Sequence, residues 1–170
     1  MHLIPPSTLR FHALLKHPAG GIWPALVSLV THGANDTLLG IHRTYLTRDG
    51  MAKAPVDPQK MSLGRCRGGA VRLSPPGARL IVGEGLETCL SVWKATGIPT
   101  WAALSTGGMR GLVLPALPVA AEIIIASDND TPGREAAHAC ACLWRKNGRT
   151  VRIALPPHGK DFNDTLRGAP

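Results

Sequence analysis

Six of the eleven acidic residues in this 170-residue chain fall in three short segments. The six are Glu84, Glu87, Asp128, Asp130, Asp161 and Asp164. Carboxylates brought close together repel one another unless a cation neutralises them. Oxygen ligands without thiol or imidazole favour a hard ion such as Mg²⁺ or Mn²⁺. We therefore expect a Mg²⁺ or Mn²⁺ site whose ligands are Glu84, Asp128, Asp130, Asp161 and Asp164.

Two of these assignments have a plain alternative. Asp128 and Asp130 precede Thr131-Pro132, and acidic residues in that position often serve only to cap a helix. The two other acidic segments, in matching positions, favour the metal site over a simple cap. For Glu87, one turn into an expected helix, the sequence leaves both possibilities open: it reaches the site or it faces solvent.

These acidic residues lie between predicted strands and helices that alternate along the chain and that must position them. Strands are expected at 79–83, 100–104, 122–127 and 149–155, and helices at 85–97, 131–147 and 161–166. Thr131 is the expected N-cap of the second helix, with Pro132 first in the helix. The glycine-rich segment 105–111 is expected to be a loop leading into a short helix or turn. This order predicts an α/β fold with a mainly parallel four-stranded sheet flanked by helices. The acids would then meet at the carboxyl ends of the strands.

A small β-rich region is expected before this sheet. Segments 25–32 and 38–46 form a predicted hairpin, a long loop spans 47–69, and a short strand covers 70–73. The connector Ser74-Pro-Pro-Gly77 is stiff. We accordingly divide the chain into a hairpin and basic-loop region, 1–78, and a catalytic domain, 79–170.

Positive charge dominates the rest of the chain. Nineteen Lys and Arg face eleven Asp and Glu, a net charge of +8. This excess favours phosphate-bearing partners, and much of it lies in the N-terminal region. A glycine-rich loop can also present backbone N–H groups to phosphate, although a simple turn is more common. The residues expected to face phosphate or nucleic acid are Arg43, Lys53, Lys60, Arg65, Arg67, Ser105, Gly107, Gly108 and Lys160.

Other classes of protein are disfavoured. No apolar run is long enough to span a membrane and the start lacks a secretory signal, so a cytoplasmic location is expected. The four cysteines form no CxxC pair, which disfavours a zinc ribbon or a redox motif. A glutamate occupies the turn in which a dinucleotide-binding fold needs glycine. The single tyrosine, Tyr45, lies inside an expected strand and is a poor candidate for a topoisomerase nucleophile.

Three segments in order carry a family resemblance. Gly83–Thr88, Ser127–Gly133 and Gly159–Asp164 resemble the Toprim domain, which bacterial primases, type IA and II topoisomerases and OLD-type nucleases share. The match is most similar to phage- and plasmid-borne primases and primase-helicases, and it covers residues 79–167. Residues 11–73 resemble the region that precedes Toprim in those proteins. Unlike them, this chain has no zinc-binding cluster and no P-loop motif, which suggests a fragment, a reduced relative or one subunit of a larger machine.

The resemblance implies roles for the acids and a reaction. Glu84 would act as general acid/base or share in metal binding, Asp128 and Asp130 would bind metal, and Asp161 would complete the shell. The implied activity is primer synthesis in phage or plasmid DNA replication, with a single-stranded DNA template, nucleotides and a replicative helicase as partners. Two alternatives stay open: a Toprim nuclease that hydrolyses phosphodiesters, and a non-catalytic nucleic-acid-binding module with a vestigial acidic site.

Overall fold

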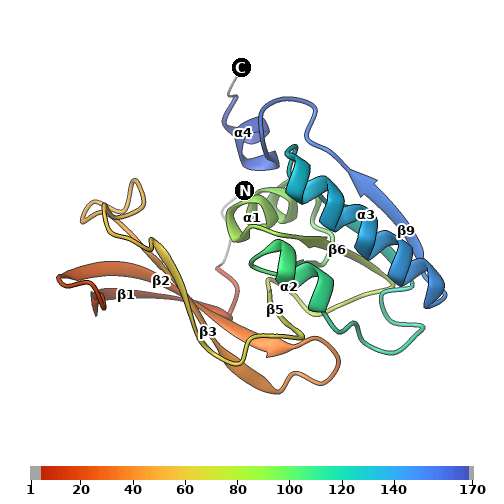
Figure 1. Ribbon diagram of the computed structural model, residues 1–170, viewed down its shortest axis with the longest axis horizontal. Helices are drawn as coiled ribbons and strands as arrows, with labels where there is room; N and C mark the ends of the chain where they lie inside the picture. Colours follow the sequence, from red (N-terminus) through yellow and green to blue (C-terminus); the bar gives the residue numbers. More distant parts are fainter. Residues whose placement is uncertain (1–4, 169–170) are drawn as a thin grey trace.

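The computed structural model describes residues 5–168 of the chain, excluding the side chain of Arg167, and shows a mixed α/β fold (Figure 1). The strands are β1 (Leu9–Lys16), β2 (Ile22–His32), β3 (Leu38–Tyr45), β4 (Lys60–Gly64), β5 (Gly69–Arg72), β6 (Arg79–Gly83), β7 (Thr100–Ala102), β8 (Glu122–Ala126) and β9 (Thr150–Ala154). The helices are α1 (Leu86–Thr96), α2 (Thr106–Gly111), α3 (Thr131–Lys146) and α4 (Phe162–Arg167).

The C-terminal half contains the expected parallel sheet. Its strands lie in the order β7-β6-β8-β9, and each neighbouring pair is parallel. Strand β8 at its centre buries Ile123 and Ile125 completely, because it has neighbours on both sides and helices against the sheet. The predicted fold class is confirmed.

Helices α1 and α3 pack on this sheet as their apolar spacing predicts. Leu86 and Cys89 of α1 are buried, as are Ala137, Cys140 and Trp144 of α3. One expected core residue differs: Leu143 is 46% exposed, because it lies at the margin of the helix face.

The start of α3 differs by one residue from the sequence-based expectation. Asp130, and not Thr131, is the N-cap, and its Oδ1 accepts a hydrogen bond from the Gly133 N–H at 2.7 Å. Pro132 is therefore the second helical residue, where its missing N–H is still tolerated because the first turn has no partner for that group.

The N-terminal half is an antiparallel array. Strands β2 and β3 form the expected hairpin. The sequence analysis missed β1, which pairs with the first part of β2, and β4, which lies inside the expected 47–69 loop and pairs with β3. Both are edge strands that leave most side chains exposed, and each carries only a brief polar–apolar alternation next to the proline and glycine residues that are typical of loops.

Strand pairing runs across the predicted division at residue 78. Strand β5 pairs with β2 on one side and with β7 on the other, both antiparallel, so that one continuous sheet joins the two halves. The guanidinium of Arg72 on β5 lies 4.3 Å from the centre of the Trp101 ring on β7. The division at 78 stays a prediction. No helix among residues 5–168 is long and apolar enough to cross a membrane.

Candidate metal centre

The predicted acids follow the carboxyl ends of adjacent parallel strands. Glu84 comes directly after β6, and Asp128 comes two residues after β8. The last residues of these strands, Gly83 and Ala126, are register partners, so the two acidic segments leave the sheet side by side. The topology therefore places both acids at the edge where open parallel sheets bind ligands.

Backbone hydrogen bonds bring the third acidic segment to the same edge. The Asn129 N–H donates to the Lys160 carbonyl at 2.8 Å, next to both Asp128 and Asp161. Helix α4 is also held against α1, because the Ser91 hydroxyl donates to Asn163 Oδ1 at 3.2 Å. We call Glu84, Asp128, Asp130 and Asp161 the acidic edge.

The carboxylates of the acidic edge influence one another's pKa values. Partial burial, followed by the negative charges of Glu84, Asp161 and Asp130, raises the pKa of Asp128 to about 6. Burial and the charge of Asp130 also raise the pKa of Glu84, against the Thr106 N–H and the Lys60 charge, which lower it. These shifts are what clustered carboxylates in a partly buried site produce.

One oxygen at the centre of the acidic edge has no partner. Asp128 Oδ1 is buried and accepts no hydrogen bond from residues 5–168. A buried carboxylate oxygen without a donor is costly, and a cation removes that cost. The donor set is entirely carboxylate, which fits a hard divalent ion.

The side chains do not form a ready-made shell. Within residues 5–168, no group of three or more His, Cys, Asp or Glu side chains is arranged to hold a metal ion. Asp130 and Asp161 each use Oδ1 as a helix cap, Asp161 by accepting the Asp164 N–H at 2.9 Å. Capping and metal binding are compatible because a cap occupies one carboxylate oxygen and leaves the second. To share an ion, these carboxylates must turn about their side-chain torsions toward Asp128.

Asp164 has a local role in the structure. Its Oδ2 accepts the Lys160 N–H at 3.0 Å, which closes the turn before α4. A Cβ at Gly159, which has a φ of +74°, would lie 2.6 Å from the Asp164 Cβ, so this turn requires glycine. Metal ligation by Asp164 stays a prediction.

The structure gives Glu87 neither of the two positions that the sequence left open. Its carboxylate faces the N-terminal region, with Oε1 and Oε2 both 2.9 Å from Lys60 Nζ, and Oε1 3.4 Å from Lys53 Nζ. Burial alone would raise the pKa of Glu87, but the hydrogen bond and charge of Lys60, aided by Lys53, bring it below the usual value. No spacing in the sequence relates residues so far apart, so sequence reasoning missed this contact.

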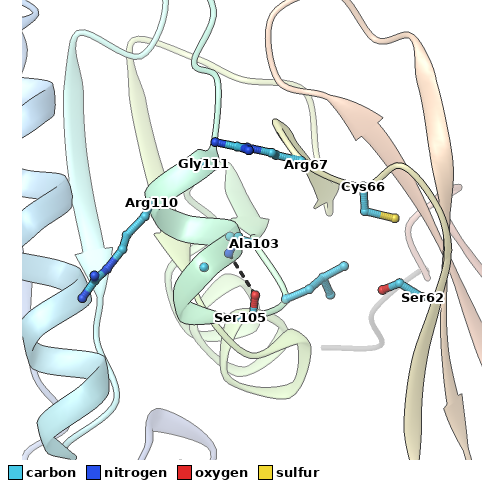
Figure 2. Close-up of a pocket in the computed structure, with 10 residues that line it drawn as sticks. Ser62, Cys66, Arg67, Ala103, Ser105, Arg110 and Gly111 are labelled. Carbon is cyan, nitrogen blue, oxygen red and sulfur yellow. Dashed lines mark hydrogen bonds between the residues drawn. The ribbon is translucent and has the colours of Figure 1, made fainter.

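A cavity of about 490 Å³ lies between α2 and the segment that connects β4 to β5 (Figure 2). Ser105, Gly107, Gly108 and Arg67, all expected to face phosphate, line it. Segment 105–111 is not the expected loop: residues 106–111 form helix α2, and Ser105 caps it by accepting the Gly108 N–H at 2.9 Å. The amide of Gly108 is therefore already engaged.

The segment between the acidic edge and this cavity holds a strained residue. Leu104 has a φ of +71°, which is unfavourable for a branched side chain, and its N–H donates to the Glu84 carbonyl at 2.8 Å. Leu104 and the start of α2 thereby connect Glu84 to the cavity wall.

The remaining basic candidates are spread over the N-terminal region and the turn before α4. Lys53, Arg65, Arg67 and Lys160 are exposed, and Arg43 is half-buried on β3. Among the described residues 5–168, Lys53 is the one member of this group that reaches an acid, Glu87. Phosphate binding by these residues stays a prediction.

Models of protein families match both halves of the chain. The model of a Toprim domain family matches residues 79–169, and the model of a domain of unknown function, DUF7146, matches residues 1–73. No curated protein matches the chain at a significant level.

Solved structures share the fold. The primase fragment of the bacteriophage T7 primase-helicase protein has a TM-score of 0.57 and 15% identity, with 92% of this chain and 62% of that chain covered. A DNA primase domain from Pseudomonas aeruginosa has a TM-score of 0.55 and 15% identity, with 92% and 52% covered. The DnaG primase catalytic domain bound to single-stranded DNA has a TM-score of 0.53 and 15% identity, with 92% and 54% covered.

The chain thus spans between about half and three fifths of these primase structures. At this identity the likeness shows the fold alone. The family match covers more than half of the 170 residues and includes the three acidic segments. The chain belongs to the Toprim domain family.

Proposed function

We propose that this protein carries out divalent-metal-dependent nucleotidyl transfer of the primase kind, making primers in phage or plasmid DNA replication. The observation that carries this proposal is the acidic edge itself. Three chain segments converge on Asp128, whose Oδ1 is buried without a donor among residues 5–168 and whose pKa is raised to about 6. Perturbed carboxylates at a strand-end crevice are typical of catalytic sites.

The acidic edge would hold Mg²⁺ or Mn²⁺ through Asp128, Asp130 and Asp161, with Glu84 as a further ligand or as general acid/base. Bound there, the ion would neutralise charge on the reacting phosphate. Glu84 is suited to proton transfer because its pKa is raised by burial and by Asp130, so that it holds a proton nearer to neutral pH than an ordinary glutamate.

The partners in this proposal follow from the charge of the protein and from its structural neighbours. A net charge of +8 favours a nucleic-acid strand, and one neighbour was solved with single-stranded DNA bound. We propose a single-stranded DNA template and nucleotides as substrates, a replicative helicase as partner and the cytoplasm as the place of action.

A single assay tests the proposal. The protein is incubated with single-stranded DNA, labelled NTPs and Mg²⁺ or Mn²⁺, and the products are examined for both extension and cleavage. Primer synthesis predicts NTP-dependent extension products. Cleavage that needs only metal and a strand would instead identify the nuclease, and binding without either product would identify the non-catalytic module.

Matched variants assign the activity to the acidic edge. Glu84→Gln and Asp128→Asn should lower the rate by roughly 10²-fold or more, since each removes a group that acts on the metal or the proton. Glu135→Gln, an exposed position on α3, should leave the rate unchanged. Equal activity in all three variants would exclude the acidic edge as the active site.

A further inference from the structure

Glu87 lies in the first turn of α1, three residues after Glu84 of the acidic edge. Both of its carboxylate oxygens lie 2.9 Å from Lys60 Nζ on β4. Strand β4 belongs to the N-terminal region and is the edge strand at the opposite end of the sheet order from β9. This contact therefore joins two parts of the molecule that strand pairing keeps far apart.

Lys60 lies near the acidic edge. Its ammonium group is 2.9 Å from Glu87, which follows Glu84 by three residues in the first turn of α1. Its positive charge also lowers the pKa of both Glu84 and Asp128, against the burial that raises them, which agrees with this position. A phosphate drawn to a metal at the acidic edge would meet Lys60 beside it.

The positive charge at this point belongs to lysine and not to the neighbouring histidine. His42 on β3 is buried and its Nδ1 lies 3.1 Å from Ser62 Oγ. Burial, together with the charges of Lys60 and Arg43, keeps this imidazole neutral near pH 7 despite the opposing charge of Glu87. Lys60 and Lys53 carry two positive charges against the one negative charge of Glu87, so the cluster keeps a surplus for an anion.

We propose that Glu87 is a positioning residue, which holds the Lys60 ammonium beside the acidic edge so that it contacts a phosphate of the bound nucleotide or strand. The ammonium has three donors, and its one hydrogen bond to Glu87, accepted by Oε2, leaves the other two for phosphate oxygens. An unrestrained lysine side chain loses conformational entropy when it contacts a phosphate. The ion pair with Glu87 already restricts the rotamers of Lys60 before the phosphate binds, which lowers this entropy cost. This inference rests on the proposed function.

A purely structural role for the pair predicts a different result. The side chains of Lys60 and Glu87 are 36% and 37% exposed. Ion pairs exposed to this degree contribute little to stability. Loss of the pair should leave the fold intact, so a binding defect can be measured on folded protein.

The test compares Glu87→Gln, Lys60→Ala and the double variant with the wild type. Affinity for ATP with Mg²⁺ and for a labelled single-stranded oligonucleotide is measured by titration calorimetry and fluorescence anisotropy. A defect confined to ATP assigns the contact to the nucleotide, and a defect confined to the oligonucleotide assigns it to the strand. Glu135→Gln and Lys146→Ala, both exposed on α3, are the matched controls.

We expect Glu87→Gln to weaken one of these affinities by about 5- to 10-fold, with the thermal midpoint within a degree of the wild type. The double variant should bind no more weakly than Lys60→Ala alone, because Glu87 acts through Lys60. In the extension assay the loss should appear in KM and not in kcat, since the contact belongs to binding.

Two results would overturn the inference: Glu87→Gln binding both ligands as tightly as Glu135→Gln does, or independent, multiplying losses in the double variant. If the wild type binds neither ligand, the inference also fails. If it binds and the variants behave as expected, but no extension appears, then the proposed primer synthesis fails while the role of Glu87 stands.

Discussion

The proposed chemistry of this protein depends on Asp128. It lies at the meeting point of the acidic segments, and three neighbouring carboxylates add to the burial that raises its pKa to about 6. A carboxylate of this kind is a poor anion by itself and a good ligand for a cation, because the ion relieves the repulsion that keeps the proton bound. If the proposed metal site is correct, Asp128 sets both the metal affinity and part of its pH dependence.

Magnesium affinity should fall as the pH drops through about 6. The metal binds the deprotonated carboxylate, so protonation of Asp128 competes with it, and below its pKa of about 6 the affinity should fall by up to tenfold per pH unit. Calorimetric titration of Mg²⁺ between pH 5 and 8 measures this, with ionic strength held constant. An affinity that is flat across pH 6 would show that Asp128 is not a ligand.

The stability of the metal-free protein, in contrast to its Mg²⁺ affinity, should decrease as the pH rises. Because the folded-state pKa of Asp128 lies above its usual value of 3.8, its favourable contribution is present at low pH and is lost as the pH rises through about 6. Thermal unfolding of the metal-free wild type and of Asp128→Asn is measured across the same pH range. As the pH rises from 5 to 7, the variant should gain stability relative to the wild type.

At the scale of single elements, the helix caps and the proposed metal ligands are the same residues. Asp130 begins α3 and Asp161 begins α4, each with one carboxylate oxygen on a backbone N–H of its own helix. Each cap keeps its carboxylate beside the acidic edge, although the side chain must still turn before its second oxygen can reach a shared ion. This double use explains why the capping interpretation and the metal interpretation of Asp128-Asn-Asp130 are not exclusive.

Two substitutions of Asp130 should separate its two roles. Asp130→Asn keeps an oxygen that caps α3, so it should weaken Mg²⁺ binding with little change in stability. Asp130→Ala removes both functions and should in addition cost about 1 kcal/mol of unfolding free energy. Denaturant unfolding and Mg²⁺ titration of each variant measure the two effects, and equal stability of the two variants would disprove the capping role.

At the scale of the whole molecule, the two regions share one sheet and one set of contacts. Arg72 at the junction stacks on Trp101 and donates to the His32 carbonyl at 2.6 Å and the Gly33 carbonyl at 2.8 Å, and it pairs with Asp36. This side chain connects the turn after β2 to the sheet of the Toprim domain. The junction is thus a packed interface and not a flexible link.

Removal of the Arg72 side chain should destabilise both regions together. Arg72→Ala leaves two carbonyls and the Trp101 ring without their partner, which should cost about 2–3 kcal/mol. Calorimetry should show a single transition shifted to lower temperature, and Arg48→Ala, in an exposed turn, is the control. Two separate transitions in the variant would show that the regions unfold independently.

Much of the C-terminal half follows from the sequence. The run at Ile123–Ile125 predicts a buried strand, the spacing of Leu86 and Cys89 predicts one face of α1, and both are confirmed because local periodicity reflects burial against a sheet. In contrast, β4 and the helical form of segment 106–111 were missed, since β4 is a short, mostly exposed edge strand within a proline- and glycine-bearing segment, and the glycines of α2 carry no helical periodicity.

The sequence by itself determined the fold class, the family and which carboxylates follow the ends of which strands, since these depend on patterns along the chain. Only the tertiary structure decided that Glu87 faces Lys53 and Lys60, that Asp130 and Asp161 are caps, and that Asp128 Oδ1 lies buried without a donor among residues 5–168. Side-chain direction and contacts between distant segments depend on how the sheet curves and how its helices pack. Neither is encoded in residue spacing.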